Sequence, residues 1–246
     1  MEPDVVAQSL CEVWERLVSW MPGGRFDRLA AGSLFSTDSP APDLQGPLVP
    51  VAGADLTTVE SARRLVRTQH RPLAIELVIG ATSLDDHLES EGFERIASRA
   101  LMCTDAAIGS SHPNARRATD ADLDTAVQLQ AAAFEMSLDS AASLYGPGWI
   151  DTASSHILVE VQDRPVAMAT AHPTEHSIGI FGVCTHPRHR LSGHATVAVR
   201  AAVASVARHD DPRPVWLHCD PGLIGVYETM GFATTGTCDV FVETHV

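Results

Sequence analysis

The fold predicted for the second half of the chain depends on residues 183–195. They are Val-Cys-Thr-His-Pro-Arg-His-Arg-Leu-Ser-Gly-His-Ala. An apolar run ends at Val183, Pro187 stops any strand, and a turn containing Gly193 leads into the helical run 196–207. The first N–H groups of a helix have no partner within the helix and lie at the positive end of its dipole. A strand, a basic turn and a helix start in this order therefore predict a phosphate-binding site.

This stretch resembles motif A of the GNAT superfamily of N-acetyltransferases. That motif is Arg or Gln, two residues, Gly, one residue, and then Gly or Ala, which Arg190, Gly193 and Ala195 match here. The family's preceding valine and proline correspond to Val183 and Pro187. The resemblance implies an α+β GNAT fold, in which helices flank a mixed, mostly antiparallel sheet. It extends over the second half of the chain, residues 113–246.

The rest of the second half has the element order that this fold requires. Short apolar runs separated by polar turns predict an antiparallel meander over 156–183. A helix over 118–134 is expected, with Thr119 as its cap, and a shorter helix over 137–144 is expected to break at Gly146-Pro147-Gly148. The remaining expected elements are a helix over 197–206, a strand over 215–219, a helix over 223–230 and a strand over 237–242.

The resemblance implies that acetyl-CoA binds beside this turn. The backbone of Val183, Cys184 and Thr185 would pair with the pantetheine arm. Asp220 takes the place of a family asparagine that contacts the cofactor. Arg190 would lie beside the pyrophosphate, which the amides of Leu191, Ser192, Gly193, His194, Ala195 and Thr196 would hold. The alternative reading of the turn is a plain strand–helix connection with two solvated arginines.

Tyr227 corresponds to the family tyrosine that protonates the departing thiolate. A phenol with a pKa near ~10 is a competent acid for a thiolate whose conjugate acid has a pKa near ~8.5. The alternative is that Tyr227 packs as part of the helix core. The segment between the first two helices lines the acceptor pocket in the family, which places Phe134, Glu135 and Tyr145 near the substrate. For Phe134, core packing is the competing expectation.

A general base is harder to find. The strand that leads into motif A reads Ile178-Gly179-Ile180-Phe181 and carries no carboxylate, and the nearby His172, Glu175 and His176 are expected in turns. Deprotonating an amine of pKa ~10.4 at pH 7 costs about 4.6 kcal/mol, whereas an α-amino group near ~7.8 costs about 1 kcal/mol. The sequence therefore favours an acceptor amine of low pKa, or a base that acts through water.

The first half contains a degenerate copy of the same pattern. Residues 71–77 and 213–219 both begin Arg-Pro and continue as apolar strands, and Gly92-Phe93 and Gly231-Phe232 both follow a predicted helix. The first copy lacks the basic turn and has Leu88 where the second has Tyr227. We expect residues 1–112 to be a degenerate, structural GNAT-like domain and residues 113–246 to be the acetyl-CoA-binding domain, unless the matches are coincidental.

The secondary structure expected in the first half follows from its periodicity and turn residues. Thr57 and Glu60 are expected to form a capping box at the start of a helix that ends near Arg67. Residues 36–46 are expected to be a loop and 106–115 a linker. The other expected elements are a helix over 4–21, strands over 47–51 and 72–78, a helix over 83–91 that ends at Gly92, and a strand over 95–103.

The composition limits the partners. The net charge is −14, from 9 Arg against 16 Asp and Glu before Pro113 and 8 against 15 after it. An acidic chain without lysine is unlike proteins that bind nucleic acid or anionic membranes, and it mildly favours cationic substrates. The predicted partner is a small-molecule or peptide amine, and a homodimer is compatible with the sequence.

The cysteines and histidines indicate no metal site. Five scattered cysteines without C-x-x-C spacing predict reduced thiols and a cytoplasmic protein, with Cys184 and Cys219 as small buried thiols and Trp216 in the core. The five histidines between His172 and His194 lack the spacing of zinc ligands. Two alternatives to an enzyme remain open, namely a non-catalytic acyl-CoA-binding module and an assembly module.

Overall fold

The computed structural model describes residues 1–38, 47–67, 72–208 and 210–244. The chain divides into two compact units, each discontinuous in sequence. The first contains Met1–Met102, His218–Gly225 and Thr234–Val246, and the second contains Cys103–Leu217 and Val226–Ala233. No helix within the described ranges combines the length and the apolar character that crossing a membrane requires.

The first unit is a mixed sheet flanked by two helices. Its strands lie in the order β1-β2-β3-β4-β11-β5, with β3 and β4 parallel and β4 and β11 antiparallel. β5 extends into the second unit, and β11 starts there. The elements are α1 (Pro3–Val18), β1 (Arg25–Leu29), β2 (Gly32–Ser36), β3 (Pro47–Pro50), α2 (Leu56–Arg67), β4 (Ala74–Val78), β5 (Phe93–Asp105) and β11 (Ala233–Glu243).

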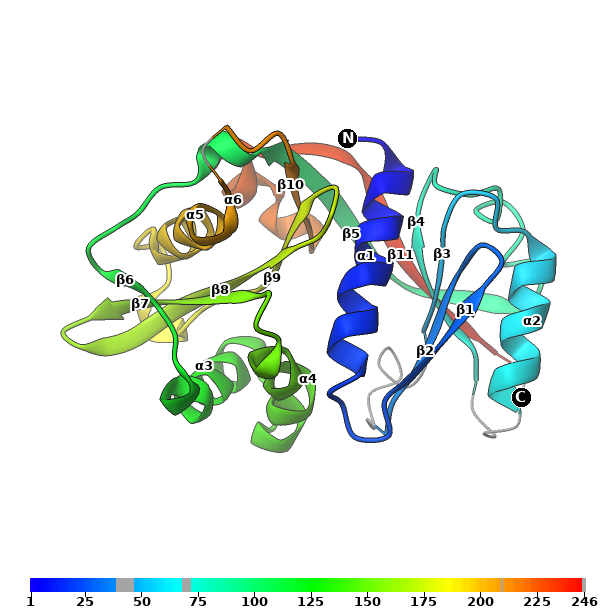
Figure 1. Ribbon diagram of the computed structural model, residues 1–246, viewed down its shortest axis with the longest axis horizontal. Helices are drawn as coiled ribbons and strands as arrows, with labels where there is room; N and C mark the ends of the chain where they lie inside the picture. The colour runs from blue at the N-terminus through cyan, green and yellow to red at the C-terminus, as the bar shows by residue number, and fades with distance from the viewer. Residues whose placement is uncertain (39–46, 68–71, 209, 245–246) are drawn as a thin grey trace. The chain divides into compact units, whose positions relative to one another are not determined.

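The two faces of this sheet are covered by different helices (Figure 1). Successive side chains of a strand point to opposite faces. Ile75 and Leu77 of β4 join a buried apolar cluster that includes Val59 of α2. Glu76, which lies between them in sequence, accepts a hydrogen bond from the indole N–H of Trp14 in α1, at 3.0 Å. The alternation of β4 therefore places α1 and α2 on opposite faces.

The end of the chain completes the first unit. β11 pairs with β4 from Cys238 opposite Val78 to Val242 opposite Ala74. Buried Arg63 of α2 donates from Nε to Glu243 Oε1 at 2.8 Å, which ties the helix to the end of β11. A strand from the second half of the sequence is therefore built into the unit formed mainly by the first half.

Most elements expected in the first half are present, with two corrections. Residues 83–91, expected to be a helix, form successive hydrogen-bonded turns instead. The cap of α2 is Asp55, whose Oδ1 accepts from the backbone N–H of Thr57 and Thr58 at 2.9 and 3.1 Å, so the expected Thr57–Glu60 capping box is wrong. Residues 39–46 of the expected loop and Arg71 of the first Arg-Pro pair lie outside the described residues.

The two Gly-Phe sites have the same backbone hydrogen bonds. The N–H of Phe93 donates to the carbonyl of Leu88, and the N–H of Phe232 donates to the carbonyl of Tyr227, both at 3.1 Å. Gly92 and Gly231 have φ values of 86° and 101°, the left-handed conformation that favours glycine after a helical turn. The two copies thus share local geometry at this point, although the first has no regular helix before it.

The second unit is a sheet in which neighbouring strands are largely antiparallel. Its strands follow the order β10-β9-β8-β7-β6, and the β6–β7, β7–β8 and β8–β9 pairs are antiparallel. This confirms the predicted meander. The elements are β6 (Ala115–Arg117), α3 (Leu123–Phe134), α4 (Leu138–Ile150), β7 (Ser155–Val161), β8 (Arg164–Pro173), β9 (Ile178–Thr185), α5 (His194–Val206), β10 (Pro214–Cys219) and α6 (Ile224–Glu228), of which β10 and α6 extend into the first unit.

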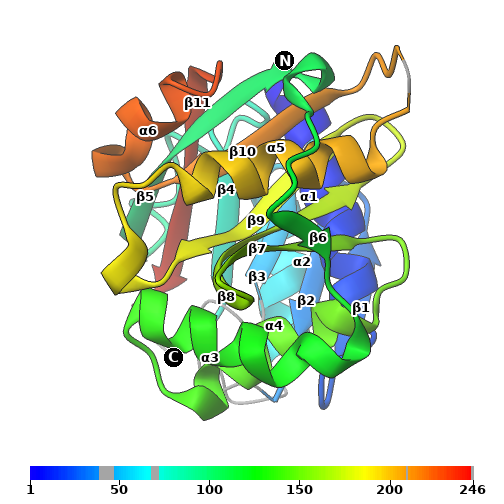
Figure 2. The same cartoon turned by 90° about the vertical axis from the view of Figure 1, so that its left-hand side faces the viewer.

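Helix α5 covers one face of the β7–β8–β9 sheet, and α3 and α4 cover the other (Figures 1 and 2). The apolar faces of the helices bury small residues against the strands. On the α3 side, Ala126 and Leu129 pack with Leu158, Met168 and Cys184. This layering, with helices on both faces of a mixed sheet, is the predicted α+β architecture.

Helix α4 is longer than expected. It runs from Leu138 to Ile150 through Gly146-Pro147-Gly148, which the sequence predicts to break it. Its start is capped by Ser137, whose Oγ accepts from the N–H of Ser140 at 3.0 Å. At its other end the indole of Trp149 donates to the carbonyl of Thr119 at 3.1 Å and stacks on His156. These tertiary contacts hold the last turn and outweigh the low helix propensity of glycine and proline.

Helix α3 begins at Leu123, later than the expected start at residue 118, and Asp122 is its cap residue. Thr119, expected to cap the helix, caps the short 3₁₀ turn over Asp120–Asp122 that precedes it. The N–H of Thr119 donates to the Asp122 carboxylate at 2.8 Å, and Arg116 donates to the same carboxylate. The Arg116 guanidinium holds the pKa of Asp122 well below its usual range.

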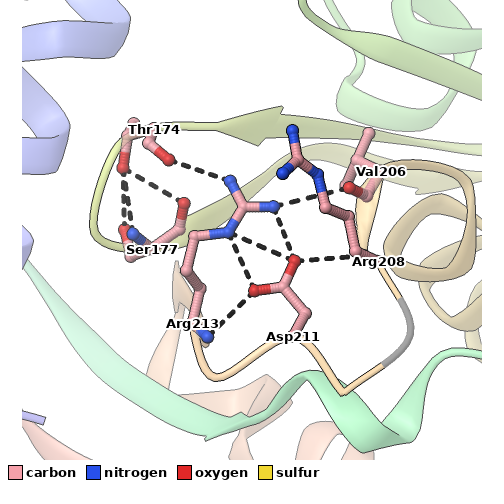
Figure 3. Close-up of polar contacts among 6 residues, drawn as sticks. All are labelled: Thr174, Ser177, Val206, Arg208, Asp211 and Arg213. Atoms are coloured by element: carbon pink, nitrogen blue, oxygen red, sulfur yellow. Dashed lines mark hydrogen bonds and ion pairs between the residues drawn. The ribbon is translucent and has the colours of Figure 1, made fainter.

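A partly buried ion pair fixes the entry to β10 (Figure 3). Arg213 donates from Nη2 to Asp211 Oδ2 at 2.6 Å and from Nη1 to the carbonyl of Thr174 at 2.9 Å. It also reaches the carbonyl of Val206 at the end of α5, at 3.4 Å. One side chain thus joins the β8–β9 turn, the end of α5 and the loop before β10. It helps to fix α5 against the strands that carry the predicted phosphate site.

Candidate acyl-CoA-binding site

The predicted phosphate turn lies between β9 and α5, and Figure 2 shows it as the yellow segment before the helix. After β9 ends at Thr185, a 3₁₀ turn over Pro187–His189 is followed by Leu191 and Gly193, with φ values of 62° and 77°. The carbonyl of Gly193 accepts the first helical bond, from Val197 N–H at 3.2 Å. The left-handed turn therefore brings the chain round so that α5 begins at His194.

This geometry suits a diphosphate. The first amides of α5 have no acceptors within the helix, and the helix dipole adds a partial positive charge there. A Cβ built on Gly193 would meet no atom within 4 Å, and the side chain of Leu191 is fully exposed. The backbone of the turn is therefore open to a ligand, while His194, Ala195 and Thr196 form the first turn of the helix.

Arg190 has a structural contact of its own. Its Nη2 donates to the carbonyl of Ala133 near the end of α3, at 2.9 Å. The last carbonyls of a helix are electronegative and lack internal partners, so a guanidinium is favourable there. The Oγ of Ser192 donates to the carbonyl of Arg190 at 3.4 Å. Arg190 thus joins the turn to α3, and Arg188 is exposed beside it.

The edge of β9 that faces β10 is paired over only two residues. Ile178 lies opposite Val215 and Gly179 opposite Trp216, although β9 continues to Thr185. Within the described part of the chain, the ladder between these two strands ends there. The backbone of Val183, Cys184 and Thr185 lies on the strand beyond this point, where an extended ligand can add to the sheet.

A bulge in β9 accompanies the end of this ladder. Opposite the Met168–Thr170 segment of β8, β9 has one extra residue, at Gly182, which has a φ of 58°. A Cβ at Gly182 would lie 3.6 Å from the ring of Tyr145, which stacks on Phe134 with centroids 6.0 Å apart. Phe134 is 44% exposed, so the competing expectation that it packs in the core is wrong. An aromatic pair thus flanks the bulged strand, and Glu135 ends α3 in the left-handed conformation.

The cysteines of this region are buried thiols, as predicted. Burial raises the pKa of Cys184 to about 12, and burial raises the pKa of Cys219 as well. A thiol with such a pKa is almost wholly protonated at neutral pH and is a poor nucleophile. All five cysteines are free, and Trp216 is buried in the core as expected.

Tyr227 and Asp220 belong to different units. Tyr227 lies in α6 within the second unit, is 7% exposed and meets Phe232 edge-on, with ring centroids 5.9 Å apart. Asp220 lies in the first unit, is exposed, and accepts the Leu223 N–H at its carbonyl, at 2.8 Å. The structure thus places Tyr227 in the same unit as the phosphate turn, in a packed environment.

The residues considered as bases lie in different surroundings. Glu175 and His176 are exposed in the β8–β9 turn, 4.0 Å apart. His172 is in strand β8 rather than in a turn, is buried, and shares a hydrogen bond between its Nδ1 and the Oγ of Ser154, which in turn donates to Asp151. No sequence motif marks this Asp151–Ser154–His172 network, because its members are separated by up to 21 residues.

Comparison with known proteins agrees with this geometry. The family model described as "Acetyltransferase (GNAT) family" matches residues 123–232. No curated protein matches the chain.

Three solved structures extend the likeness to nearly the whole chain. A GCN5-related N-acetyltransferase from Kribbella flavida is 18% identical with a TM-score of 0.71, covering 98% of this chain and 96% of its own. A tandem GNAT protein from the clavulanic acid biosynthesis pathway is 12% identical with a TM-score of 0.62, covering 98% and 94%. A GCN5-related N-acetyltransferase from Sphaerobacter thermophilus is 14% identical with a TM-score of 0.57, covering 98% and 92%. At these identities the likeness concerns the fold. The chain therefore has the GNAT fold, and its residues 123–232 match the acetyltransferase (GNAT) family model.

Proposed function

We propose that this protein is an N-acetyltransferase that moves the acetyl group of acetyl-CoA to an amine of a small molecule or peptide. The observation that carries the proposal is the turn before α5, where positive φ values at Leu191 and Gly193 open the helix N-terminus to a ligand. The second support is the β9 edge that is left beyond the short β9–β10 ladder.

The turn and the strand have separate tasks in this proposal. The amides from Leu191 to Thr196 hold the diphosphate, and the backbone from Val183 to Thr185 pairs with the amides of the pantetheine arm. Acetyl-CoA itself supplies the activated thioester. Arg190 stabilises the turn through its bond to the end of α3.

We assign the reaction to direct attack of the amine on the thioester. Tyr227 donates a proton to the departing thiolate, for which a phenol is a suitable acid. Burial keeps Cys184 protonated, which disfavours a covalent thioester on this residue. In a direct mechanism the amine nitrogen forms the new amide bond as the bond from the acetyl carbon to sulfur breaks. The nitrogen loses its proton to water, and Tyr227 regains a proton from water.

The acceptor is an amine of low pKa. Strand β9 offers only Ile178, Gly179, Ile180 and Phe181 before its bulge, and none of these can take a proton. An α-amino group is already partly neutral at pH 7, so it needs no strong base. The stacked Phe134–Tyr145 pair beside Gly182 would form an apolar wall for this acceptor.

Thiol release across a panel of amines tests the proposal. We expect release of CoA with α-amino acceptors and a rate that levels off above their pKa. Isothermal titration with acetyl-CoA, run alongside, reports binding separately from turnover. A pH–rate profile that still rises steeply above about pH 9 would contradict the low-pKa acceptor, and absence of acetyl-CoA binding would refute the whole assignment.

A second candidate function is a non-catalytic acyl-CoA-binding module. It is favoured by the lack of an ionisable side chain on the β9 segment Ile178–Phe181. The same two measurements distinguish the candidates, because a binding module takes up acetyl-CoA in the titration but releases no thiol with any amine.

For the domains, we propose that residues 1–112 are a degenerate GNAT-like half with a structural role. β11, from the second half of the sequence, pairs with β4, so we expect residues 113–246 alone to be poorly soluble with β11 unpaired. A fragment that is well behaved and fully active would argue against a structural role for the first half. If the fragment is soluble only when another protein is present, an assembly role for the first half gains support.

The five free thiols favour a cytoplasmic location. If the protein forms a homodimer, sedimentation will detect it.

A further inference from the structure

Three side chains with metal-binding atoms meet inside the first unit, outside the site described above. They are Glu76 of β4, His218 near the end of β10 and Cys238 of β11, and their ligand atoms all lie within 4.8 Å of one another. Glu76 Oε1 is 3.9 Å from His218 Nδ1 and 3.8 Å from Cys238 Sγ. The cluster combines a carboxylate, an imidazole and a thiol.

The sheet register explains why Glu76 and Cys238 meet. Cys238 lies opposite Val78 and Val240 opposite Glu76 in the antiparallel β4–β11 pair. Glu76 and Cys238 are therefore diagonal neighbours on the same face of the sheet. This is the face that α1 covers, and Trp14 of α1 holds the other carboxylate oxygen, Oε2, at 3.0 Å. The Trp14 contact leaves Oε1 turned toward the imidazole and the thiol.

The surroundings favour a cation between these groups. Glu76 and Cys238 are buried, and a buried carboxylate is costly unless a positive charge or hydrogen bonds compensate it. Cys238 Sγ donates to Glu76 Oε1 at 3.8 Å, so its proton lies between the two ligand atoms. A divalent ion in place of this proton would balance the charges of the Cys238 thiolate and the Glu76 carboxylate.

We propose that Glu76, His218 and Cys238 form a zinc site in the first unit, with a fourth position open to water or another ligand. One thiolate, one imidazole and one carboxylate oxygen are ligands that zinc accepts, whereas magnesium and calcium prefer oxygen alone. Binding releases the thiol proton of Cys238 to solvent, and no oxidation or reduction takes place.

The distances are compatible with this ion. Bonds of about 2.3 Å to sulfur and about 2.0 Å to nitrogen and oxygen give tetrahedral edges of roughly 3.3 to 3.6 Å. The two edges at Glu76 Oε1, 3.9 Å to His218 and 3.8 Å to Cys238, would contract by roughly 0.6 and 0.3 Å on binding. The third edge, between His218 and Cys238, is no longer than 4.8 Å and would contract by at most about 1.3 Å. Nδ1 of His218 is shielded from solvent, whereas 19% of the His218 side chain is exposed. An ion can therefore reach the cluster from solvent along the exposed part of this side chain.

Trp14 acts as a positioning residue in this site. Its indole N–H fixes the orientation of the Glu76 carboxylate, the role that outer hydrogen bonds play for metal ligands. Losing such a partner typically weakens metal binding by about 10- to 100-fold. This predicts a measurable effect from a residue that never touches the ion.

The test uses the full chain, stripped with a chelator and titrated with Zn²⁺ and with Co²⁺. We expect one equivalent of zinc to bind and Co²⁺ to produce a thiolate-to-cobalt charge-transfer band. Cys238→Ser should abolish the band, and Glu76→Gln should weaken zinc binding at least about tenfold. Trp14→Phe should weaken it by about 10- to 100-fold without removing the band. Cys103→Ser, a buried cysteine of the second unit, is the matched control and should change neither measurement.

Two results would overturn the proposal. The first is that the wild-type protein takes up no stoichiometric zinc. Arg99 would then be the positive charge that acts on His218. The other is zinc uptake that survives both Glu76→Gln and Cys238→Ser. If Cys238→Ser fails to fold by circular dichroism, Glu76→Gln, which keeps the shape of the side chain, decides the question. Acetyl-CoA binding is not a readout here, so failure of this site leaves the proposed function untouched.

Discussion

Gly193→Ala tests whether the left-handed turn before α5 is needed for ligand binding. Gly193 has a φ of 77°, and a Cβ there would meet no atom within 4 Å. The substitution therefore adds no clash, and its effect comes from the backbone alone. An alanine in the left-handed region costs about 1–2 kcal/mol. If the turn keeps its shape, stability falls by that amount. If the turn relaxes, acetyl-CoA binding weakens by a factor of about 5–30.

The assays are thermal unfolding and isothermal titration with acetyl-CoA. A loss of 1 kcal/mol lowers Tm by about 2–4 °C in a protein of this size. Gly146→Ala is the matched control, since its Cβ also meets nothing within 4 Å but its φ is not positive. It should leave binding unchanged and stability the same or slightly higher. Gly193→Asn should recover part of the loss, because asparagine tolerates this conformation better. If Gly193→Ala matches Gly146→Ala in both assays, the turn geometry plays no part in binding.

Three further outcomes are expected. Tyr227→Phe should lower kcat by roughly 10²-fold or more while leaving the Kd for acetyl-CoA unchanged; an unchanged kcat would assign Tyr227 to packing alone. The hydrogen bond from Arg213 lowers the pKa of Asp211, so this pair stabilises the fold at neutral pH, and the contribution is lost as the pH falls through the lowered value. Asp211→Asn should therefore lower Tm at pH 7 and flatten its acid dependence, and equal Tm curves would contradict this. Ser137→Ala removes the cap of α4 and should cost about 1 kcal/mol in urea unfolding, whereas Ser140→Ala, which keeps the backbone donor, should cost less.

Each of the two units contains a cluster of acid–base groups outside the turn before α5. In the second unit the network of Asp151, Ser154 and His172 is buried beside Phe181, whose ring meets His172 edge-on. In the first unit the imidazole of His218 lies against a carboxylate and a thiol. The first network joins the segment after α4 to strand β8, and the second cluster joins strands β4, β10 and β11. Neither includes a residue of the turn before α5, so their effects can be measured separately from acetyl-CoA titration.

Local features of the fold could be predicted because they depend on short-range chemistry. The strand, turn and helix around Gly193 follow from an apolar run, a proline and a glycine within a few residues, and the β7–β8–β9 meander follows from short apolar runs between polar turns. Local rules failed where distant contacts outweighed them. Helix α4 continues through Gly146-Pro147-Gly148 because Trp149 contacts Thr119. Residues 83–91 have the apolar pattern of a helix but form turns.

The GNAT motif, the antiparallel meander and the buried cysteines can be inferred from the amino-acid sequence, because spacing and polarity within a dozen residues specify them. The pairing of β11 with β4, and the meeting of Glu76, His218 and Cys238, follow only from the folded chain. Strand partners are chosen by long-range burial and register, which bring together residues more than a hundred positions apart. A local sequence pattern therefore does not predict which strands pair.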